Sequence, residues 1–256
     1  MSNPFSWFQK RLSQRWSGDG GYREFLMLAF PLILATSSWS IQQFVDRVFL
    51  TWYSPAAVAA AMPAGMLNFA PMSLFQGLVG YVDVFIAQYY GAKRYAMIGP
   101  SLWQGLYLAL LGGICMLALA PFAQPIFDFI GHSPDVRENE VIFFQTLCYG
   151  GFPALASVVM SGFFAGRGET WVLVWVNAAA TMVTVVLDYL LIFGNWGFPE
   201  LGIQEAALAT VASSVFTFLM YGALIFGRRY RRGYGSVQNR RPARFPVCHS
   251  PTAHLA

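Results

Sequence analysis

The chain has 256 residues, of which 56% are hydrophobic and only 11% are charged. Soluble globular domains carry about 25% charged residues, so this composition excludes an ordinary soluble enzyme and indicates a membrane-embedded protein. The net charge of +4 comes from basic residues scattered among several loops, which argues against a nucleic-acid-binding patch.

Residues 1–24 are polar and basic, and no small-residue cleavage site follows a short apolar run within them. We therefore expect a cytoplasmic segment that contains no removable signal peptide. The composition changes at about residue 25, where a membrane region of residues 25–230 begins.

Six apolar stretches in this region are long enough to cross a bilayer, which takes about 20 residues in a helix. They cover, approximately, residues 25–52, 56–90, 96–126, 140–165, 169–194 and 204–227. The second stretch contains Pro63 and Pro71, so we expect it to be bent. The sequence predicts an all-α, polytopic membrane protein with six transmembrane helices.

The lysines and arginines alternate with the six stretches. Of those that lie outside the stretches up to residue 232, eleven fall on one side of the predicted membrane and one, Arg137, on the other. The eleven are Lys10, Arg11, Arg15, Arg23, Lys93, Arg94, Arg167, Arg228, Arg229, Arg231 and Arg232. Because basic residues favour the cytoplasmic side, both termini are predicted to be cytoplasmic, and we expect a plasma (inner) membrane location.

Two aspartates, Asp46 and Asp188, lie inside apolar stretches. A carboxylate in hydrocarbon is unfavourable enough that it normally faces a partner or a water-filled cavity. Asp46, Asp188 and Thr210 each lie six residues from the estimated outer end of their stretch, which is roughly 9 Å at a rise of about 1.5 Å per residue. The three residues are therefore predicted to share one depth.

Polar residues continue the helical faces that carry the two aspartates. Asn177, Thr181 and Thr184 lie on the same stripe as Asp188, and Gln42 lies one turn before Asp46. These residues are candidates for the polar lining of a cation site. The alternative is that the hydroxyl and amide groups only join neighbouring helices.

The remaining polar and reactive residues give weaker signals. Asp83 lies near the inner end of its stretch, where we expect a structural ion pair with Lys93 or Arg94. Glycines 162, 166 and 168 fit a close helix contact and a turn, not a phosphate-binding loop. Neither the cysteines nor the histidines have the spacing of a metal site, so no cofactor is expected, and no nucleophile motif indicates an enzyme.

Residues 231–256 have no helical periodicity and differ in character from the preceding stretches. We expect a disordered cytoplasmic tail. Its abrupt onset is also what a truncated or frame-shifted reading frame would produce.

Four segments, in order and with matching spacing, make the chain resemble the multidrug and toxic compound extrusion (MATE) family. They are FPLILATSSWSIQQFVDRVFLTWYS, AQYYGAKR, SGFFAGRGETW and TVVLDYLLIFGNWGFPELGIQEAALAT. The resemblance runs from about residue 24 to residue 230 and covers only the first of the family's two six-helix lobes. It implies an all-helical exporter that exchanges protons or sodium ions for cationic or amphipathic drugs.

The resemblance also implies roles for individual residues. Asp46 and Asp188 match the acidic residues of the first and fifth helices, and Ala206 and Thr210 match cation-site positions of the sixth. Thr184 stands where the family commonly has asparagine, which leaves the coupling ion, H⁺ or Na⁺, open. Half of the wall of the substrate cavity would come from a second lobe.

The leading hypothesis is therefore the first lobe of a cation-coupled antiporter for drug-like small molecules in a lipid bilayer. Cation binding at the aspartates would bend or repack the first helix at Pro31, where the proline ring removes a backbone hydrogen bond. Two alternatives remain. One is a flippase for lipid-linked precursors, and the other is a non-transporting membrane fragment that associates with itself or with another lobe.

Overall fold

The computed structural model describes residues 22–192 and 203–227. The predicted basic amino-terminal segment, for its first 21 residues, and the predicted tail lie outside the described residues. Within them the chain is helical, and no strand occurs in this part.

Eight α-helices account for the described residues. They are α2 (Tyr22–Tyr53), α3 (Pro55–Gly91), α4 (Ile98–Leu119), α5 (Ala123–Ile130), α6 (Pro134–Tyr149), α7 (Gly151–Ala165), α8 (Thr170–Ile192) and α9 (Ile203–Phe226), with the short 3-10 helices η1 (Tyr95–Met97) and η2 (Ala120–Phe122) on either side of α4. Five stretches are long and apolar enough to cross a membrane singly, and the bent pair α6–α7 supplies a sixth. The predicted all-α membrane fold is confirmed, and the count of six spans holds when the bent pair is taken as one span.

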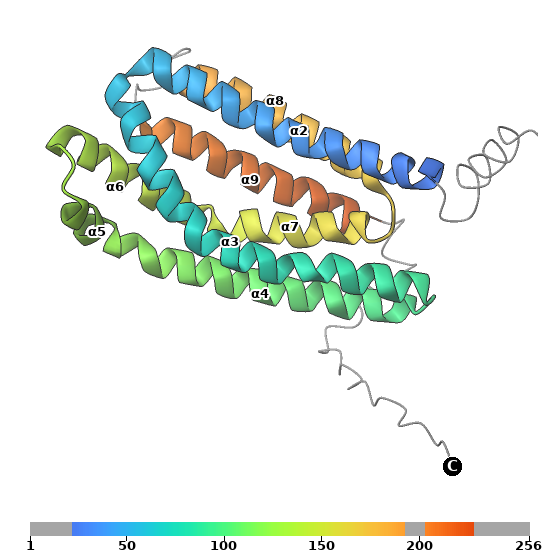
Figure 1. Cartoon of the computed structure of the whole chain (residues 1–256). Coiled ribbons are helices and arrows are strands. Elements are labelled where there is room, and N and C mark those ends of the chain that lie inside the picture. Colours follow the sequence, from blue (N-terminus) through green and yellow to red (C-terminus); the bar gives the residue numbers. More distant parts are fainter. Residues whose placement is uncertain (1–21, 193–202, 228–256) are drawn as a thin grey trace, which may run out of the picture.

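The second crossing is one continuous helix that bends. Helix α3 contains Pro63 and Pro71 in its interior, and Figure 1 shows it changing direction midway along its length. A proline inside a helix lacks the N–H that would bond to the preceding turn, so the helix axis yields there. The bend predicted from the sequence is present.

The fourth crossing differs from the predicted straight span of residues 140–165. It begins earlier, at Pro134, and consists of α6 and α7, which meet at an angle of 46°. Gly150 and Gly151 lie at the break, and Pro153 follows in the first turn of α7. Two glycines and a proline together weaken the backbone hydrogen-bond ladder, which explains the bend.

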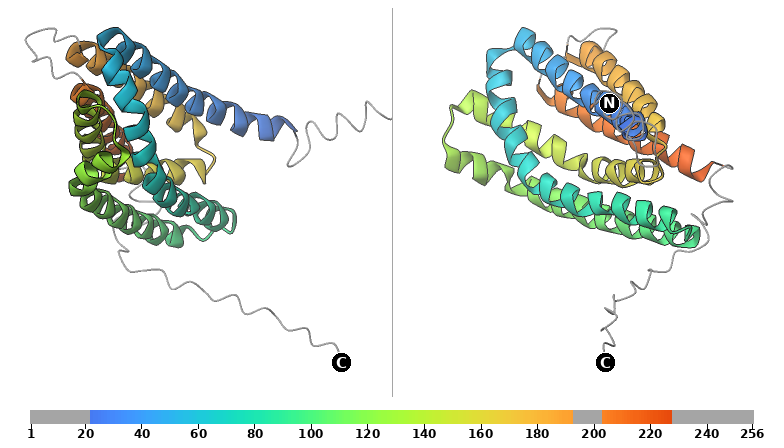
Figure 2. Two further views of the ribbon diagram at one scale, coloured as in Figure 1. Left: turned by 60° about the vertical axis from the view of Figure 1, so that its left-hand side comes forward. Right: turned by 45° about the vertical axis from the view of Figure 1, so that its right-hand side comes forward.

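The helices form two groups. Helix α2 packs along α8, and α8 packs on α9, while α3, α4 and α7 pack against one another (Figure 1). Both views in Figure 2 show α2 and α3 meeting at the Tyr53–Pro55 end and diverging from there, which leaves α2 at the edge of the bundle. A small cluster at this end brings together Leu50, Ala57 and Ala206, so the end of α2 and the starts of α3 and α9 are neighbours.

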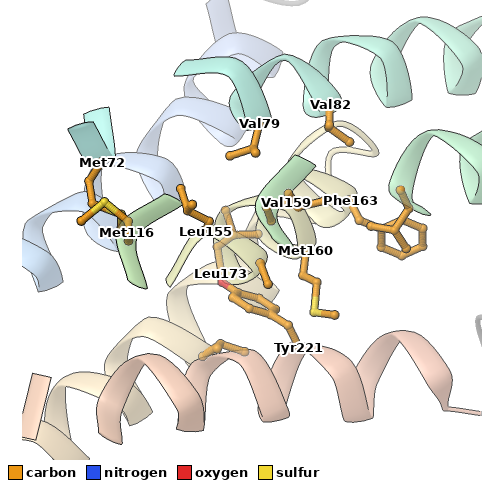
Figure 3. Packing of buried hydrophobic residues seen from close by; sticks show 14 of the residues in the cluster. Met72, Val79, Val82, Met116, Leu155, Val159, Met160, Phe163, Leu173 and Tyr221 are labelled. Carbon is orange, nitrogen blue, oxygen red and sulfur yellow. The ribbon is translucent and has the colours of Figure 1, made fainter. Parts of the chain in front are cut away.

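The main core lies between α3, α4, α7 and α9. Figure 3 shows Val79, Val82, Leu155 and Val159 converging there, with Tyr221 approaching from α9. In a membrane these contacts are stabilised by close packing, because lipid tails are as apolar as the side chains themselves.

Glycines allow two of these helices to approach closely. A Cβ atom built on Gly113 of α4 would lie 2.5 Å from the Cβ and 2.8 Å from the Cα of Phe152, and one on Gly151 of α7 would lie 2.9 Å from Met116 Cβ. No side chain fits at such distances, so α4 and α7 touch through their backbones, as small residues permit in membrane helices.

The glycines after α7 form the close helix contact and the turn that were predicted. A Cβ on Gly166 would lie 2.6 Å from the backbone oxygen of Asp83, so α7 packs directly on α3, and Gly168 has a left-handed φ of 76° in the turn that follows. The ion pair predicted for Asp83 is wrong. Among the described residues its half-buried carboxyl pairs with neither Lys93 nor Arg94, both of which are exposed.

Candidate functional site

Asp46 and Asp188 face each other across the contact between α2 and α8. Asp188 is fully buried and Asp46 is half-buried, and their carboxyl groups lie within interaction distance of each other. The two residues are 142 positions apart in the sequence. The structure therefore brings together the two acidic residues that the sequence singled out.

This carboxyl pair lacks conventional hydrogen-bond donors. Within the described part of the chain, both oxygens of Asp188 and Oδ1 of Asp46 are buried without a hydrogen-bond partner. Two ionised carboxylates in contact repel each other, whereas a carboxyl that carries a proton can donate it to its neighbour. The geometry suits a proton shared by the pair, or a cation held between the two groups.

Thr184 lies one turn before Asp188 and Thr210 one turn after Ala206, and the hydroxyl of each donates to its own helix. The buried Thr184 hydroxyl donates to the backbone oxygen of Ala180 at 3.0 Å, and the Thr210 hydroxyl donates to Ala206 at the same distance. Each hydroxyl oxygen keeps a lone pair that could face a cation. The buried Ala206 packs with Leu50, one turn beyond Asp46, so Ala206 lies at the end of the bundle that holds Asp46.

The other predicted lining residues lie in the α2–α8 contact. Thr181 donates to the backbone oxygen of Ser38, and Asn177 donates to that of Ala35, both at 3.4 Å. Gln42 is half-buried one turn before Asp46. These bonds support the alternative that Thr181 and Asn177 join neighbouring helices.

Pro31 is buried in the first half of α2, which continues through it as a single helix. Its role as a hinge stays a prediction.

Helix α9 carries a stripe of polar residues that were not predicted from the sequence as part of the site. Tyr221 is buried and its hydroxyl donates to Asn177 at 3.4 Å, and Ser213 donates to the backbone oxygen of Ala180 at 3.4 Å. Thr210, Ser213, Thr217 and Tyr221 are spaced three or four apart. This stripe would have revealed the face of α9 that meets α8.

A second buried carboxyl, Glu140 in α6, also went unrecognised. It lies at the first position of the predicted apolar stretch 140–165 and is fully buried, and His132 contacts its Oε1 at 2.8 Å through Nδ1. The second oxygen, Oε2, is buried and has no partner among the described residues. The eight-residue separation across a turn carried no recognisable spacing signal.

We expect His132→Ala to destabilise the purified chain by about 1–3 kcal/mol, because it removes the observed partner of a buried carboxyl. The exposed ion pair of Arg137 with Asp128, at 2.8 Å in the same region, provides the matched control. Arg137→Ala should lower stability by at most about 1 kcal/mol. Unfolding in detergent measures both changes, and equal losses would contradict the structural role of His132.

The described residues hold no group of three or more histidine, cysteine, aspartate or glutamate side chains placed to bind a metal ion. The carboxyl pair contributes two such side chains. A transition-metal site is therefore not indicated in this part of the chain.

Comparisons with known proteins agree with this architecture. A family model described as MatE matches residues 31–190. A probable multidrug resistance protein NorM from Synechocystis is 30% identical over 208 residues, covering 81% of this chain and 45% of that protein. Its namesake from Burkholderia pseudomallei is 32% identical over 202 residues, covering 78% and 43%. The chain thus spans about half the length of the curated relatives it matches.

Solved structures show the same fold. An outward-facing multidrug resistance MATE family transporter of the MOP superfamily superposes with a TM-score of 0.77 at 21% identity, covering 86% of this chain and 48% of that one. A eukaryotic MATE transporter gives a TM-score of 0.75 at 20% identity, covering 83% and 47%. The described helices therefore share the fold of about half of such a transporter.

Proposed function

The chain belongs to the MatE family, and from this premise we propose that it is the cation-binding lobe of a multidrug antiporter. Its relatives are named multidrug resistance proteins, and its several apolar helices make it a multi-pass membrane protein. In this proposal the lobe exchanges a coupling cation for an amphipathic, drug-like compound.

The observation that carries the proposal is the proximity of the Asp46 and Asp188 carboxyl groups. A buried carboxyl pair without other donors changes its net charge when a proton arrives or leaves. Such a change alters how strongly α2 is attracted to or repelled from α8. Proton binding would thereby reposition α2, with Pro31 as its hinge, and release the compound.

We propose H⁺ as the coupling ion. A proton needs only the two facing carboxyl groups, whereas Na⁺ would need further oxygen ligands beside them, for which the lone pairs of the Thr184 and Thr210 hydroxyls are the candidates. The proximity of the two carboxyl groups favours the simpler arrangement. Sodium coupling is the alternative outcome of the experiment below.

The proposal includes a second lobe as partner, either another polypeptide or a second copy of this chain. It also includes a plasma (inner) membrane location with both termini in the cytoplasm, which the distribution of basic residues supports. In that orientation the carboxyl pair lies near the outer surface, where protons enter.

Proteoliposomes that contain the chain and a second lobe would test this function. A pH gradient should drive movement of a fluorescent amphipathic dye, and dissipating the gradient should stop it. Dye movement driven by a Na⁺ gradient alone would overturn the choice of ion. Translocation of labelled lipid without dye movement would overturn the proposed function in favour of a flippase.

A further inference from the structure

A line of polar side chains runs along the exposed side of α2. Its members are three or four residues apart and so share one helix face. They are Thr36, Ser40, Gln43, Arg47 and Thr51, and all five are exposed. This face differs from the one that carries Asp46 against α8, so packing between these helices does not account for it.

Arg47 is the charged member of this line. Its guanidinium donates to the thioether sulfur of Met62 in α3. Sulfur is a weak acceptor, and a guanidinium has five N–H donors, so this contact leaves most of the hydrogen-bonding capacity unused. The ion pairs formed within residues 22–192 and 203–227 do not include Arg47.

The neighbouring face of α3 is apolar and adaptable. Met62, Met66 and Phe69 are spaced as one helix face and are 45%, 69% and 58% exposed. Methionine side chains are flexible and polarizable, which suits contacts with varied apolar shapes. We call these three residues, together with the polar line of α2, the α2–α3 face. Figure 2 shows the two helices diverging from their common end.

The membrane setting restricts what this face can meet. Both helices are membrane-crossing stretches. A line of five polar residues that includes an arginine is unfavourable in contact with lipid tails. Arg47 therefore faces water, a lipid headgroup or a bound molecule. The single charge of the α2–α3 face is positive, and Met62 of its apolar part contacts that charge.

We propose that the α2–α3 face binds the transported compound and selects amphipathic molecules that carry an anionic group. A carboxylate or sulfonate pairs with Arg47 and accepts hydrogen bonds from Gln43 and Ser40, while an aromatic body lies on Met62 and Met66. This inference rests on the proposed function, because it names the substrate class of that transport. It replaces the cationic class implied by family resemblance.

Three pyrene probes that differ only in charge test the preference: pyrenebutyrate, pyrenebutanol and a pyrenebutyl trimethylammonium salt. Binding to the purified chain in a neutral detergent is followed by energy transfer from tryptophan. We expect pyrenebutyrate to bind about tenfold more tightly than the ammonium probe, equivalent to about 1.4 kcal/mol. Equal affinities, or tighter binding of the ammonium probe, would overturn the proposal.

Two variants assign the preference to Arg47. Arg47→Gln should abolish it, and Arg47→Lys should keep part of it because the charge remains. Arg94→Gln removes an exposed cation from the α3–α4 connection and should change nothing. Size-exclusion chromatography verifies that each variant remains folded. An anion preference that survives in Arg47→Gln would contradict the assignment.

Other occupants of the face give distinct results. If Arg47 pairs with a second copy of the chain, Arg47→Gln will dissociate a dimer seen by light scattering, which overturns the proposal. Stoichiometric phospholipid phosphate that co-purifies with the wild type but not with Arg47→Gln would overturn it in favour of a lipid headgroup. The binding assay uses no gradient, so failure of proton-driven exchange with an intact anion preference would refute only the proposed function.

Discussion

Asp188→Asn is expected to reduce proton-driven transport to the level of vesicles without protein. Asparagine has nearly the same shape, and its amide can donate to the remaining Asp46 carboxylate, so the α2–α8 contact should survive. The pair would then hold no exchangeable proton. Asp46→Asn should have the same effect for the same reason. Dye movement under a pH gradient, in vesicles that contain both lobes, measures the loss.

Asp83→Asn is the matched control for this prediction. Asp83 is also an aspartate in a membrane-crossing helix, but it lies against Gly162 of α7 and Gly166 just after that helix, away from the carboxyl pair. Transport should therefore continue in Asp83→Asn. Equal activity of Asp188→Asn and the wild type would show that the coupling site lies elsewhere.

Gly166→Ala is expected to destabilise the lobe by about 1–3 kcal/mol, as overpacking commonly does. The added Cβ would lie 2.6 Å from the backbone oxygen of Asp83 and 3.0 Å from the backbone nitrogen of Ala87. Backbone atoms cannot rotate away as a side chain can, so α3 and α7 would have to separate. Thermal unfolding of the purified chain in detergent, followed by circular dichroism, measures the loss.

Gly77→Ala in α3 provides the control. Nothing lies within 4 Å of a Cβ at Gly77, and alanine is favoured over glycine in a helix interior by about 1 kcal/mol. We expect unchanged or slightly increased stability. If the two alanine variants unfolded at the same temperature, the close contact between α3 and α7 would be wrong.

Much of the fold could be predicted because membrane helices follow simple rules of length and polarity. The six crossings and the bend of α3 required only apolar length and the positions of Pro63 and Pro71. The bend between α6 and α7 was not predicted, although Gly150, Gly151 and Pro153 mark it. The hydropathy of residues 140–165 does not distinguish one straight helix from two bent ones.

The acidic site could be predicted from the sequence for a related reason. Asp46 and Asp188 stand out because carboxylates are unfavourable in hydrocarbon. Each lies six residues from the estimated outer end of its stretch, which predicts that they share one depth. The contacts of Glu140 and Arg47 could not be predicted from the sequence. Both depend on how α5, α6 and α3 are oriented around their axes, as shown by the contacts to His132 and Met62. Neither contact follows a helical spacing within one element.

The central claim is that Asp46 and Asp188 share one exchangeable proton. Infrared spectroscopy of the purified chain at neutral pH tests it through the carbonyl stretching band of a protonated carboxylic acid. The claim predicts such a band in the wild type and in Asp83→Asn, and its loss in Asp188→Asn and in Asp46→Asn. A spectrum without the band in the wild type, or with the band retained in both pair variants, would contradict the claim.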